Sequence, residues 1–314
     1  MQTGRIWVVS ISRLGFLLLL VACAQTSGTS QWRAPLYQHH NLVGRIWSSE
    51  DREFVDEMNL WSSVDSARYV LLGEKHDNPD HHDLQLQLLN RMIEDNRLSH
   101  VTFEMLDSTA DLQLQQFTRQ EFATRDDIKN YLQWDEQGWD WNFYGPLLEA
   151  AHRAAVPVRS GNISNETVGQ VYGQETPEAI AAVFDDTVME KLFEDIDASH
   201  CGLLPESQFP AMVRVQQTRD DRMAKQLATR SASNVAVLIA GNYHVRQDLG
   251  VPNYLLAQNG AFTMEDIVSI AFLEVQPGEN NPADYLEQFN AVPAYDYIWF
   301  TPAVTAEDYC DSLR

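Results

Sequence analysis

A short apolar run that leads directly into a dense polar turn constrains this chain more than any other feature. Tyr69–Leu72 is β-rich and continuously apolar, and Gly73 bounds it, which is typical of a strand buried on both faces. Pro79 suits the first turn of a helix, and apolar residues recur at helical spacing from Leu84 to Ile93. The turn between them concentrates carboxylates, imidazoles and a lysine. Because open parallel sheets bind ligands at the carboxyl ends of their strands, this stretch predicts a site.

Further candidate strands recur along the chain, with helical patterns between most of them: His100–Phe103, Val156–Arg159, Val235–Ala240, Ile267–Val275 and Tyr297–Phe300. This alternation predicts an α/β domain over 41–314, with a mostly parallel central sheet flanked by helices. Two of the intervals are too long for one crossover helix. Helical insertions are therefore expected at about 107–155 and 163–230, forming a helical subdomain over the strand ends.

The first residues have the pattern of an export signal. Arg5 and Arg13 flank the start of a short apolar run, Gly15–Ala22, which is too short to cross a bilayer. Small residues end the run, as in signal peptides. Residues 1–22 are therefore expected to be a signal peptide rather than part of the fold.

The end of this leader resembles a bacterial lipobox. In the sequence Leu20–Cys23 the cysteine would become the lipidated first residue of the mature chain, although a cleaved signal with an incidental cysteine is the alternative. Residues 23–40 are then expected to be a tether. Ala24 is not the aspartate that resembles an inner-membrane retention signal, so the expected location is the outer membrane of a Gram-negative bacterium.

The chain is strongly acidic. Its formal charge is −23, and removal of Arg5 and Arg13 with the leader would make it −25. Such a surface repels nucleic acid, and an anionic ligand would need local cations. Two further cysteines, Cys201 and Cys310, could pair in an oxidising periplasm or remain separate thiols, and the sequence does not decide between these alternatives.

Carboxylates and imidazoles follow three of the predicted strands. Glu74 and His76 alternate at the exit of the first strand, Glu104 ends the second, and His244 follows the fourth. Histidine and carboxylate together suit a divalent metal ion or acid–base chemistry. For one glutamate alone, a structural acid that caps a helix is the simpler interpretation. For all four residues at one edge of the sheet, a site is favoured.

Two histidines and one arginine are further candidates. His81 and His82 occupy the first turn of a helix, where the helix dipole disfavours protonation, so both are expected to be neutral. They could ligate a metal or form a solvated pair. Arg219 lies on an otherwise largely apolar stripe of the helix predicted for Glu206–Thr229. A buried guanidinium requires a partner, which would be a strand-end glutamate, an anionic ligand or an ordinary structural acid.

The stretch Tyr131–Pro146 is unusually aromatic, with three tryptophans, a phenylalanine and two tyrosines. Aromatic residues at this density usually form core. They could also wall a pocket for a flat apolar ligand, with a tyrosine oxygen available to iron. No nucleophile elbow, phosphate loop, dinucleotide fingerprint or HExxH pattern is present in the sequence.

Together these stretches resemble the ChaN family of haem-binding lipoproteins, part of a wider group with erythromycin esterase and the Tiki and TraB proteins. The resemblance covers most of the mature chain in order. Its segments are Leu71–Pro79 with His81 and His82, Phe103–Met105, Trp139–Trp141 with Tyr144 and Pro146–Leu147, His200–Pro205, Gln216 with Arg219 and Asp220, Met223–Ala224, and Ala240–Arg246.

The resemblance implies an α/β domain with a helical one and a role in haem or iron uptake. It implies ferric haem held by a tyrosine where two protomers face one another, with an outer-membrane haem or iron receptor as a further partner. Tyr144 is the chosen iron ligand because it lies in the matched aromatic motif. Tyr243 stands where relatives commonly have glycine and is the rival ligand. Lys75 and one of His81 or His82 are the candidates for the haem propionates.

The same group implies an alternative from another class. Glu74, His76, Glu104 and His244 resemble the metal-site residues proposed for the Tiki branch. This chain would then be a metal-dependent peptidase or esterase, with Glu74 or Glu104 as the base for a metal-bound water and Arg219 as an auxiliary residue.

Overall fold

The computed structural model describes Met1 and residues 32–231, 234–258, 262–286, 289 and 292–313. Trp32–Arg314 form one compact unit, so residues 32–40, which the sequence assigned to a tether, belong to the folded domain. Ala34 is fully buried there, and the backbone N–H groups of Arg33 and Ala34 donate to the Asp80 carboxylate at 2.8 and 2.9 Å. The predicted leader and lipobox lie outside the described residues.

The described residues form a mixed sheet of eight strands in the order β2-β1-β8-β7-β3-β6-β4-β5. Six neighbouring strands, from β8 to β5, run parallel, and β1 pairs antiparallel with both β2 and β8. The parallel strands are those expected from the sequence, whereas the three-residue strands β1 and β2 are too short to leave a pattern. The strands are β1 Ile46–Ser48, β2 Glu53–Val55, β3 Tyr69–Glu74, β4 Leu98–Asp107, β5 Val158–Asn162, β6 Val235–Gly241, β7 Ile267–Glu274 and β8 Tyr297–Thr301.

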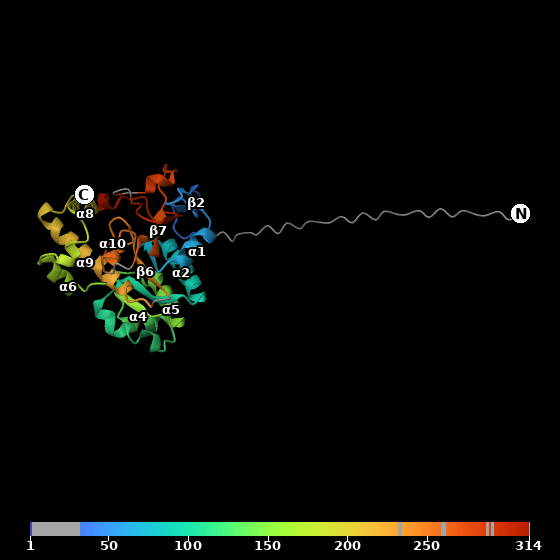
Figure 1. Cartoon of the computed structure of the whole chain (residues 1–314), viewed down its shortest axis with the longest axis horizontal. Coiled ribbons are helices and arrows are strands. Elements are labelled where there is room, and N and C mark those ends of the chain that lie inside the picture. The colour runs from blue at the N-terminus through green and yellow to red at the C-terminus, as the bar shows by residue number, and fades with distance from the viewer. Residues whose placement is uncertain (2–31, 232–233, 259–261, 287–288, 290–291, 314) are drawn as a thin grey trace. The chain divides into compact units, whose positions relative to one another are not determined.

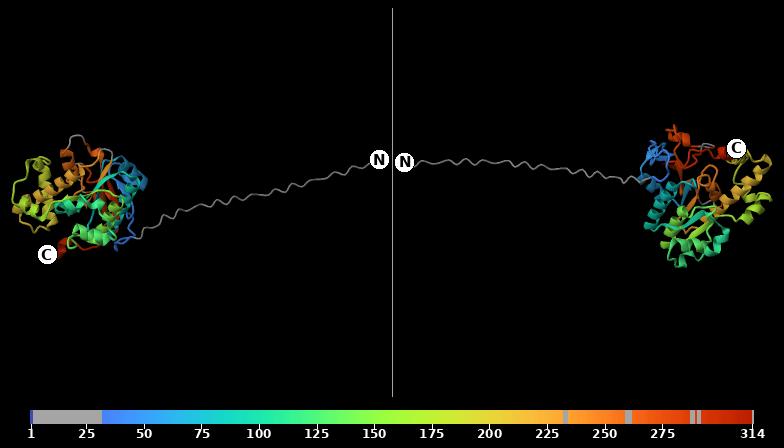
Figure 2. Two further views of the ribbon diagram at one scale, coloured as in Figure 1. Left: turned by 90° about the horizontal axis from the view of Figure 1, so that it is seen from below. Right: turned by 180° about the vertical axis from the view of Figure 1, so that it is seen from behind.

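Helices cover both faces of the sheet (Figures 1 and 2). Those between β4 and β5 and between β5 and β6 fill the two expected insertions, but they pack within the same compact unit as the sheet. The predicted α/β class is therefore confirmed. The helices are α1 Glu57–Ser66, α2 Pro79–Glu94, α3 Asp111–Leu114, α4 Arg125–Leu132, α5 Trp141–Arg153, α6 Asn165–Tyr172, α7 Glu178–Ala181, α8 Asp186–Ser199, α9 Phe209–Leu227 and α10 Val251–Gln258.

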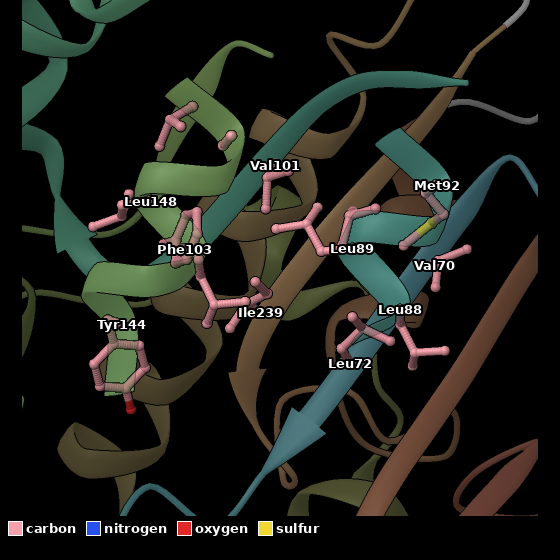
Figure 3. Packing of buried hydrophobic residues seen from close by; sticks show 14 of the residues in the cluster. Val70, Leu72, Leu88, Leu89, Met92, Val101, Phe103, Tyr144, Leu148 and Ile239 are labelled. Atoms are coloured by element: carbon pink, nitrogen blue, oxygen red, sulfur yellow. The ribbon is translucent and has the colours of Figure 1, made fainter. Parts of the chain in front are cut away.

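The alternation of side chains along β3 divides the core into two layers. Val70 and Leu72 belong to one layer with α2 and α5, in which Leu88 lies beside Leu72 and Leu148 lies beside Phe103 of β4 (Figure 3). Tyr69 and Leu71 belong to the other layer, formed with α9 and α10. Because both faces of the strand are covered, all six of its residues are buried, as the continuous apolar run indicated.

Local chemistry fixes where β3 gives way to α2. The Asn78 side chain accepts a hydrogen bond from the Asp80 N–H at 2.9 Å, and Pro79 occupies the first helical turn. An asparagine cap followed by proline is a strong signal for a helix start, and the predicted boundary is confirmed. The polar turn is consequently held at the carboxyl edge of the sheet.

A disulfide bond joins Cys201, just after α8, to Cys310 in the 3-10 helix Tyr309–Leu313. Their Cα atoms lie 5.4 Å apart, and 109 positions separate them in the sequence. The pairing that the sequence left open is therefore present. Among the described residues, no helix is both long and apolar enough to cross a membrane.

Candidate functional site

Three parallel strands bring the predicted acids and imidazoles to one edge of the sheet. β3 ends in Glu74, β4 carries Glu104, and β6 ends in Gly241, three residues before His244. Glu104 Oε2 accepts a hydrogen bond from the Gly241 N–H at 2.7 Å, and its Oε1 lies 3.3 Å from His244 Nε2. A methyl group added at Gly241 would lie 3.0 Å from His76 Nε2 and 3.6 Å from Glu104 Oε2. The predicted convergence of these side chains is confirmed.

Glu74 forms the hub of the first polar group. Its Oε1 accepts hydrogen bonds from the Tyr144 hydroxyl at 2.5 Å and from His76 Nδ1 at 2.9 Å. His82 Nδ1 lies 3.3 Å from the other carboxylate oxygen. Burial and the adjacent Glu74 charge raise the pKa of Tyr144 far above its ordinary value, so its hydroxyl stays protonated and donates to Glu74.

Tyr144 is not presented to a ligand in this arrangement. Its side chain is 1% exposed, with the ring in the apolar layer and the hydroxyl directed out of that layer (Figure 3). The rest of the aromatic stretch is largely core as well, because Trp134 and Trp141 are buried with ring centroids 5.2 Å apart. Trp139 is half-buried and meets the His76 ring edge-on at 4.9 Å. The simpler interpretation of this stretch, that it forms core, accounts for most of it.

His244 is the centre of the second polar group. Its Nδ1 lies 2.5 Å from Asp220 Oδ1, and its Nε2 faces Glu104. Burial alone would lower the pKa of His244, but the two carboxylates raise it to about 10. Burial would likewise raise the pKa of Glu104, but His244 and the Gly241 N–H lower it to about 2. A buried imidazolium therefore lies between two acids.

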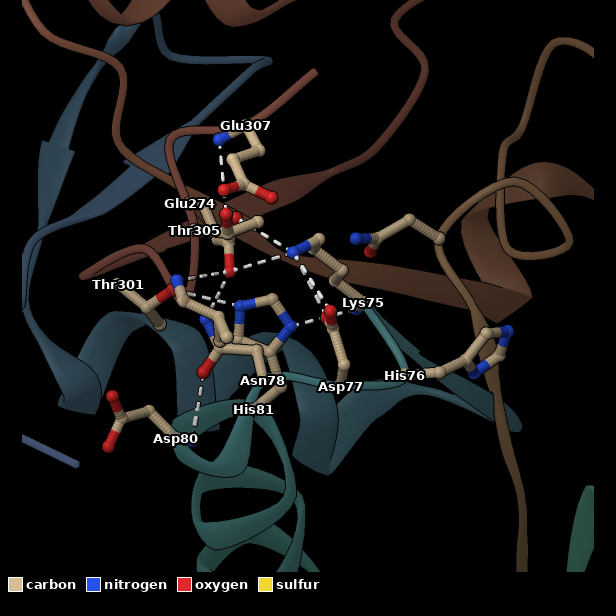
Figure 4. A network of polar contacts seen from close by, with 12 residues as sticks. Lys75, His76, Asp77, Asn78, Asp80, His81, Glu274, Thr301, Thr305 and Glu307 are labelled. Atoms are coloured by element: carbon tan, nitrogen blue, oxygen red, sulfur yellow. Dashed lines mark hydrogen bonds and ion pairs between the residues drawn. The ribbon is translucent and has the colours of Figure 1, made fainter. Parts of the chain in front are cut away.

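His81 and Lys75 form a structural network at the start of α2 (Figure 4). His81 is fully buried; its Nδ1 accepts from the Lys75 N–H at 2.8 Å, and its Nε2 lies 2.8 Å from Thr301 Oγ1. Burial lowers the pKa of His81 well below its usual value, with His82 and Lys75 adding to the effect. His81 is therefore neutral, as expected, but mainly because of burial, and it is closed to a haem propionate.

His82 is likewise enclosed, with an exposed fraction of 3%. Its Nε2 lies 3.0 Å from the His76 carbonyl oxygen, and its ring stacks on Phe143 at 4.6 Å with an interplanar angle of 9°. Neither member of the histidine pair is thus a solvated residue or an open propionate partner. His76, by contrast, has a side chain that is 42% exposed and points away from the Lys75 network (Figure 4).

The imidazole of His76 is oriented by the hub. Burial tends to lower its pKa, but the hydrogen bond to Glu74 and the Glu104 charge outweigh this effect and raise it. The ring passes close to Gly241, where no side chain intervenes. His76 is consequently the accessible imidazole of this edge.

Arg219 does not meet a strand-end glutamate, and its predicted role towards an anionic ligand stays a prediction. Within the described part of the chain it forms no hydrogen bond or ion pair with Glu74, Glu104 or another acid, and its buried Nε has no partner. The stripe that suggested its orientation is interrupted by Asp220, which turns inward to His244. Helical spacing alone could not separate these adjacent positions, because α9 packs along a wide face.

A pocket of about 740 Å³ opens at this edge of the sheet. Glu74, His76 and His244 from the two polar groups line it, as do Lys75 and Tyr243. Apolar residues line the side formed by α8, α9 and the loop after β6: Leu192, Ile196, Val213 and Leu249. The Tyr243 hydroxyl donates to Asp195 Oδ2 at 2.9 Å.

Comparison with known proteins assigns this architecture to a family. The family profile described as "Haem-binding uptake, Tiki superfamily, ChaN" matches residues 60–255. The chain belongs to this family. No curated protein matches the chain in sequence.

A solved structure shares the fold of this chain. The structure titled "Cofacial heme binding to ChaN of Campylobacter jejuni" has a TM-score of 0.67 and 23% sequence identity, and the alignment covers 81% of this chain and 95% of that one. The erythromycin esterase EreC in its open conformation has a TM-score of 0.49 and 12% identity, over 85% of this chain and 99% of that one. The fold and the family resemblance expected from the sequence are thus confirmed.

The predicted divalent-metal site does not take shape in this ChaN-family chain. Glu74 is engaged by His76 and Tyr144, while Glu104 is engaged by His244 and Gly241. Among the described residues, no group of three or more His, Cys, Asp or Glu side chains is arranged to hold a metal ion. The metal-dependent hydrolase stays a prediction.

Sequence reasoning missed Asp220 and Asp195 as site residues. Asp220 lay within a matched family segment, and its position next to Arg219 could have raised the question of which of the two turns inward. Asp195 lies in a helix with many acids, and nothing in the local pattern distinguishes it. Its contact with Tyr243 depends on how α8 packs against the loop after β6.

The buried imidazolium predicts a pH-dependent stability. Because folding raises the pKa of His244 from about 6.5 to about 10, its stabilisation is complete below pH 6.5 and is lost as the pH rises towards 10. A tenfold change in proton affinity corresponds to about 1.4 kcal/mol. Between pH 6 and pH 9.5, the free energy of unfolding measured in urea should therefore fall more for the wild type than for His244→Gln. Parallel pH profiles for the two proteins would contradict the assignment.

Proposed function

We propose that this protein binds ferric haem and takes part in haem or iron acquisition. The observation that carries the proposal is a half-buried tyrosine, Tyr243, on the wall of a roomy pocket in a chain of the ChaN family. A C. jejuni member of that family is described as binding haem cofacially. The apolar residues that line the pocket suit the face of a porphyrin, and polar side chains such as Lys75 and His76 line it as well.

The donor set fits ferric haem at Tyr243 better than at Tyr144. Tyr144 is buried and donates to Glu74, whereas Tyr243 lines the pocket. Burial and the Asp195 charge raise the pKa of Tyr243, so the ligand-free residue is a phenol whose proton points at Asp195. Ferric iron supplies the positive charge that stabilises a phenolate in such a place.

Lys75 is our candidate for the propionates. It lies on the pocket wall, is 38% exposed and pairs with Asp77 and Glu274 at 3.0 and 3.2 Å. Ion pairs at this exposure contribute little, so Lys75 can turn towards a carboxylate at low cost. His76 is the other accessible group at the pocket that can carry positive charge.

The proposal extends to features that rest on the sequence. These are a lipid anchor at Cys23, residence in the outer membrane, a homodimer that places two haem pockets face to face, and an outer-membrane haem or iron receptor as partner. The leader pattern supports the first two, and the family resemblance supports the last two.

A haemin titration tests the ligand assignment. The wild type should give a saturable Soret shift, and Tyr243→Phe should weaken binding about tenfold or more, equivalent to at least about 1.4 kcal/mol, because the anionic ligand is lost. Tyr144→Phe should retain the wild-type spectrum, and Tyr285→Phe is the control because Tyr285 also lines the pocket. Absence of a saturable shift in the wild type would end the proposal. Loss of the shift in Tyr144→Phe alone would return the ligand role to Tyr144.

A further inference from the structure

Helix α8 forms one wall of the pocket but is weakly attached to the rest of the fold. It contributes to the lining with Leu192, Asp195, Ile196 and Ser199. Of its fourteen residues, all of which the structure describes, only Val188 and Leu192 are buried. These two pack with Val213 and Leu249 in a small apolar cluster that is separate from both layers of the main core, and Met189, Phe193 and Ile196 of the helix are partly buried against it. Elements with so little buried apolar surface open at low free-energy cost.

The polar contacts of α8 with the body are also few. The Tyr243 hydroxyl donates to Asp195, and Gln217 of α9 contacts Met189 at 3.6 Å. Binding of iron by Tyr243, as proposed above, would remove the first of these contacts. The wall therefore requires another constraint if it is to stay in place around a ligand.

The disulfide supplies that constraint at the C-terminal end of the helix. His200 caps α8, and Cys201 follows directly in a left-handed conformation with φ of 61°, next to Gly202 with φ of 67°. Its partner Cys310 lies in the segment that follows strand β8 of the sheet. Figure 1 shows this C-terminal end beside α8. The covalent bond thus ties the wall of the pocket to a segment leading from the sheet.

We propose that the Cys201–Cys310 disulfide is a redox-sensitive clasp on the pocket: a dithiol reductant that opens it releases α8 and weakens retention of the bound ligand. The identity of that ligand rests on the proposed function, whereas the movement of α8 does not. The clasp would couple delivery of the cargo to a partner that carries a reactive dithiol.

The dithiol reductant supplies the electrons and protons that the disulfide exchange requires. A thiolate of the dithiol attacks the sulfur of Cys310, which is the more accessible partner because Cys201 is 7% exposed, and Cys201 leaves as a thiolate and takes up a proton. The second thiol of the reductant then attacks the mixed disulfide and frees Cys310. The reductant becomes a disulfide, and two electrons and two protons pass to the protein. The exposed side chains of Leu203 and Tyr309, at 58% and 67%, flank the bond that is attacked.

Hydrogen exchange of the full chain without haem tests the movement directly. In Cys201→Ser/Cys310→Ser, and in wild type reduced with a phosphine, α8 amides should exchange at least tenfold faster while the amides of α2 remain protected. Leu203→Ser, which leaves the disulfide intact beside the same surface, should match the oxidised wild type. Unchanged exchange in α8, or equal loss of protection in α2, would overturn the clasp.

Haemin transfer to excess apomyoglobin tests the consequence for the ligand. The double serine variant should release haemin at least tenfold faster than the oxidised wild type, and Leu203→Ser should release it at the wild-type rate. Equal release rates would overturn the role of the clasp in retention. If no variant binds haemin but α8 still opens on reduction, the haem proposal fails while the clasp stands.

Discussion

Replacing Glu74 with alanine should lower the free energy of unfolding by about 3 kcal/mol, the upper end of the cost of leaving a buried hydrogen-bonding group unsatisfied. The Glu74 carboxylate is buried and accepts from Tyr144 and His76, with His82 Nδ1 beside it. Alanine leaves the buried Tyr144 hydroxyl without its acceptor. His76 is exposed and can hydrogen-bond to solvent, so it adds little to the cost.

Urea unfolding of three variants measures this effect. Glu74→Gln keeps one acceptor for Tyr144 and should lose about 1–3 kcal/mol, the cost of imperfect pairing of a buried group. Glu94→Ala removes an exposed carboxylate at the end of α2 and should stay within about 0.5 kcal/mol of wild type. A Glu74→Ala protein as stable as wild type would mean that the hub contributes nothing to the fold.

The second large effect is expected at Gly73, where β3 passes closest to the loop after β6. A methyl group there would lie 2.5 Å from both Asn242 Oδ1 and Val245 Cγ2. Neither neighbour can withdraw easily, because Asn242 Nδ2 donates to the Phe272 carbonyl at 2.8 Å and Val245 is fully buried. Gly73→Ala should therefore destabilise the protein by about 3 kcal/mol, the upper part of the usual cost of overpacking.

Gly169→Ala is the matched control for this change. Gly169 lies inside α6, and a methyl group there would have no atom within 4 Å. That substitution should stabilise the protein by about 0.5–1 kcal/mol, because alanine restricts the unfolded chain and favours helix. Thermal unfolding of both variants gives the comparison, and a Gly73→Ala protein that melts at or above the wild-type temperature would refute the close approach.

Both predictions concern the same few residues that join the strand edge to the site. Gly73 lets the loop carrying Tyr243 and His244 approach β3, and Glu74 orients His76, which lines the pocket. Stability and site geometry are therefore coupled here. A haemin titration of Gly73→Ala would report a weakened site only if the variant remains folded, so Glu74→Gln is the better probe of the pocket.

The sequence by itself determined the parallel sheet, the edge at which the site lies and the family. Tyr69–Leu72 could only be a strand covered on both faces, and Asn78 with Pro79 fixed the start of α2, because these signals act over a few neighbouring residues. Parallel strands end at a common edge, so Glu74, Glu104 and His244 were expected there. The strand order β3-β6-β4, which makes them neighbours, comes from the tertiary structure.

Only the tertiary structure decided which side chain has which role. His81, His82 and Tyr144 carry groups that look available in the sequence, yet packing of α2 and α5 against the sheet buries them. Tyr243 meets Asp195, and Cys201 meets Cys310, across long separations in the chain. Exposure and partnership depend on contacts between distant segments, and residue type and local spacing do not determine which of two chemically similar groups faces a pocket.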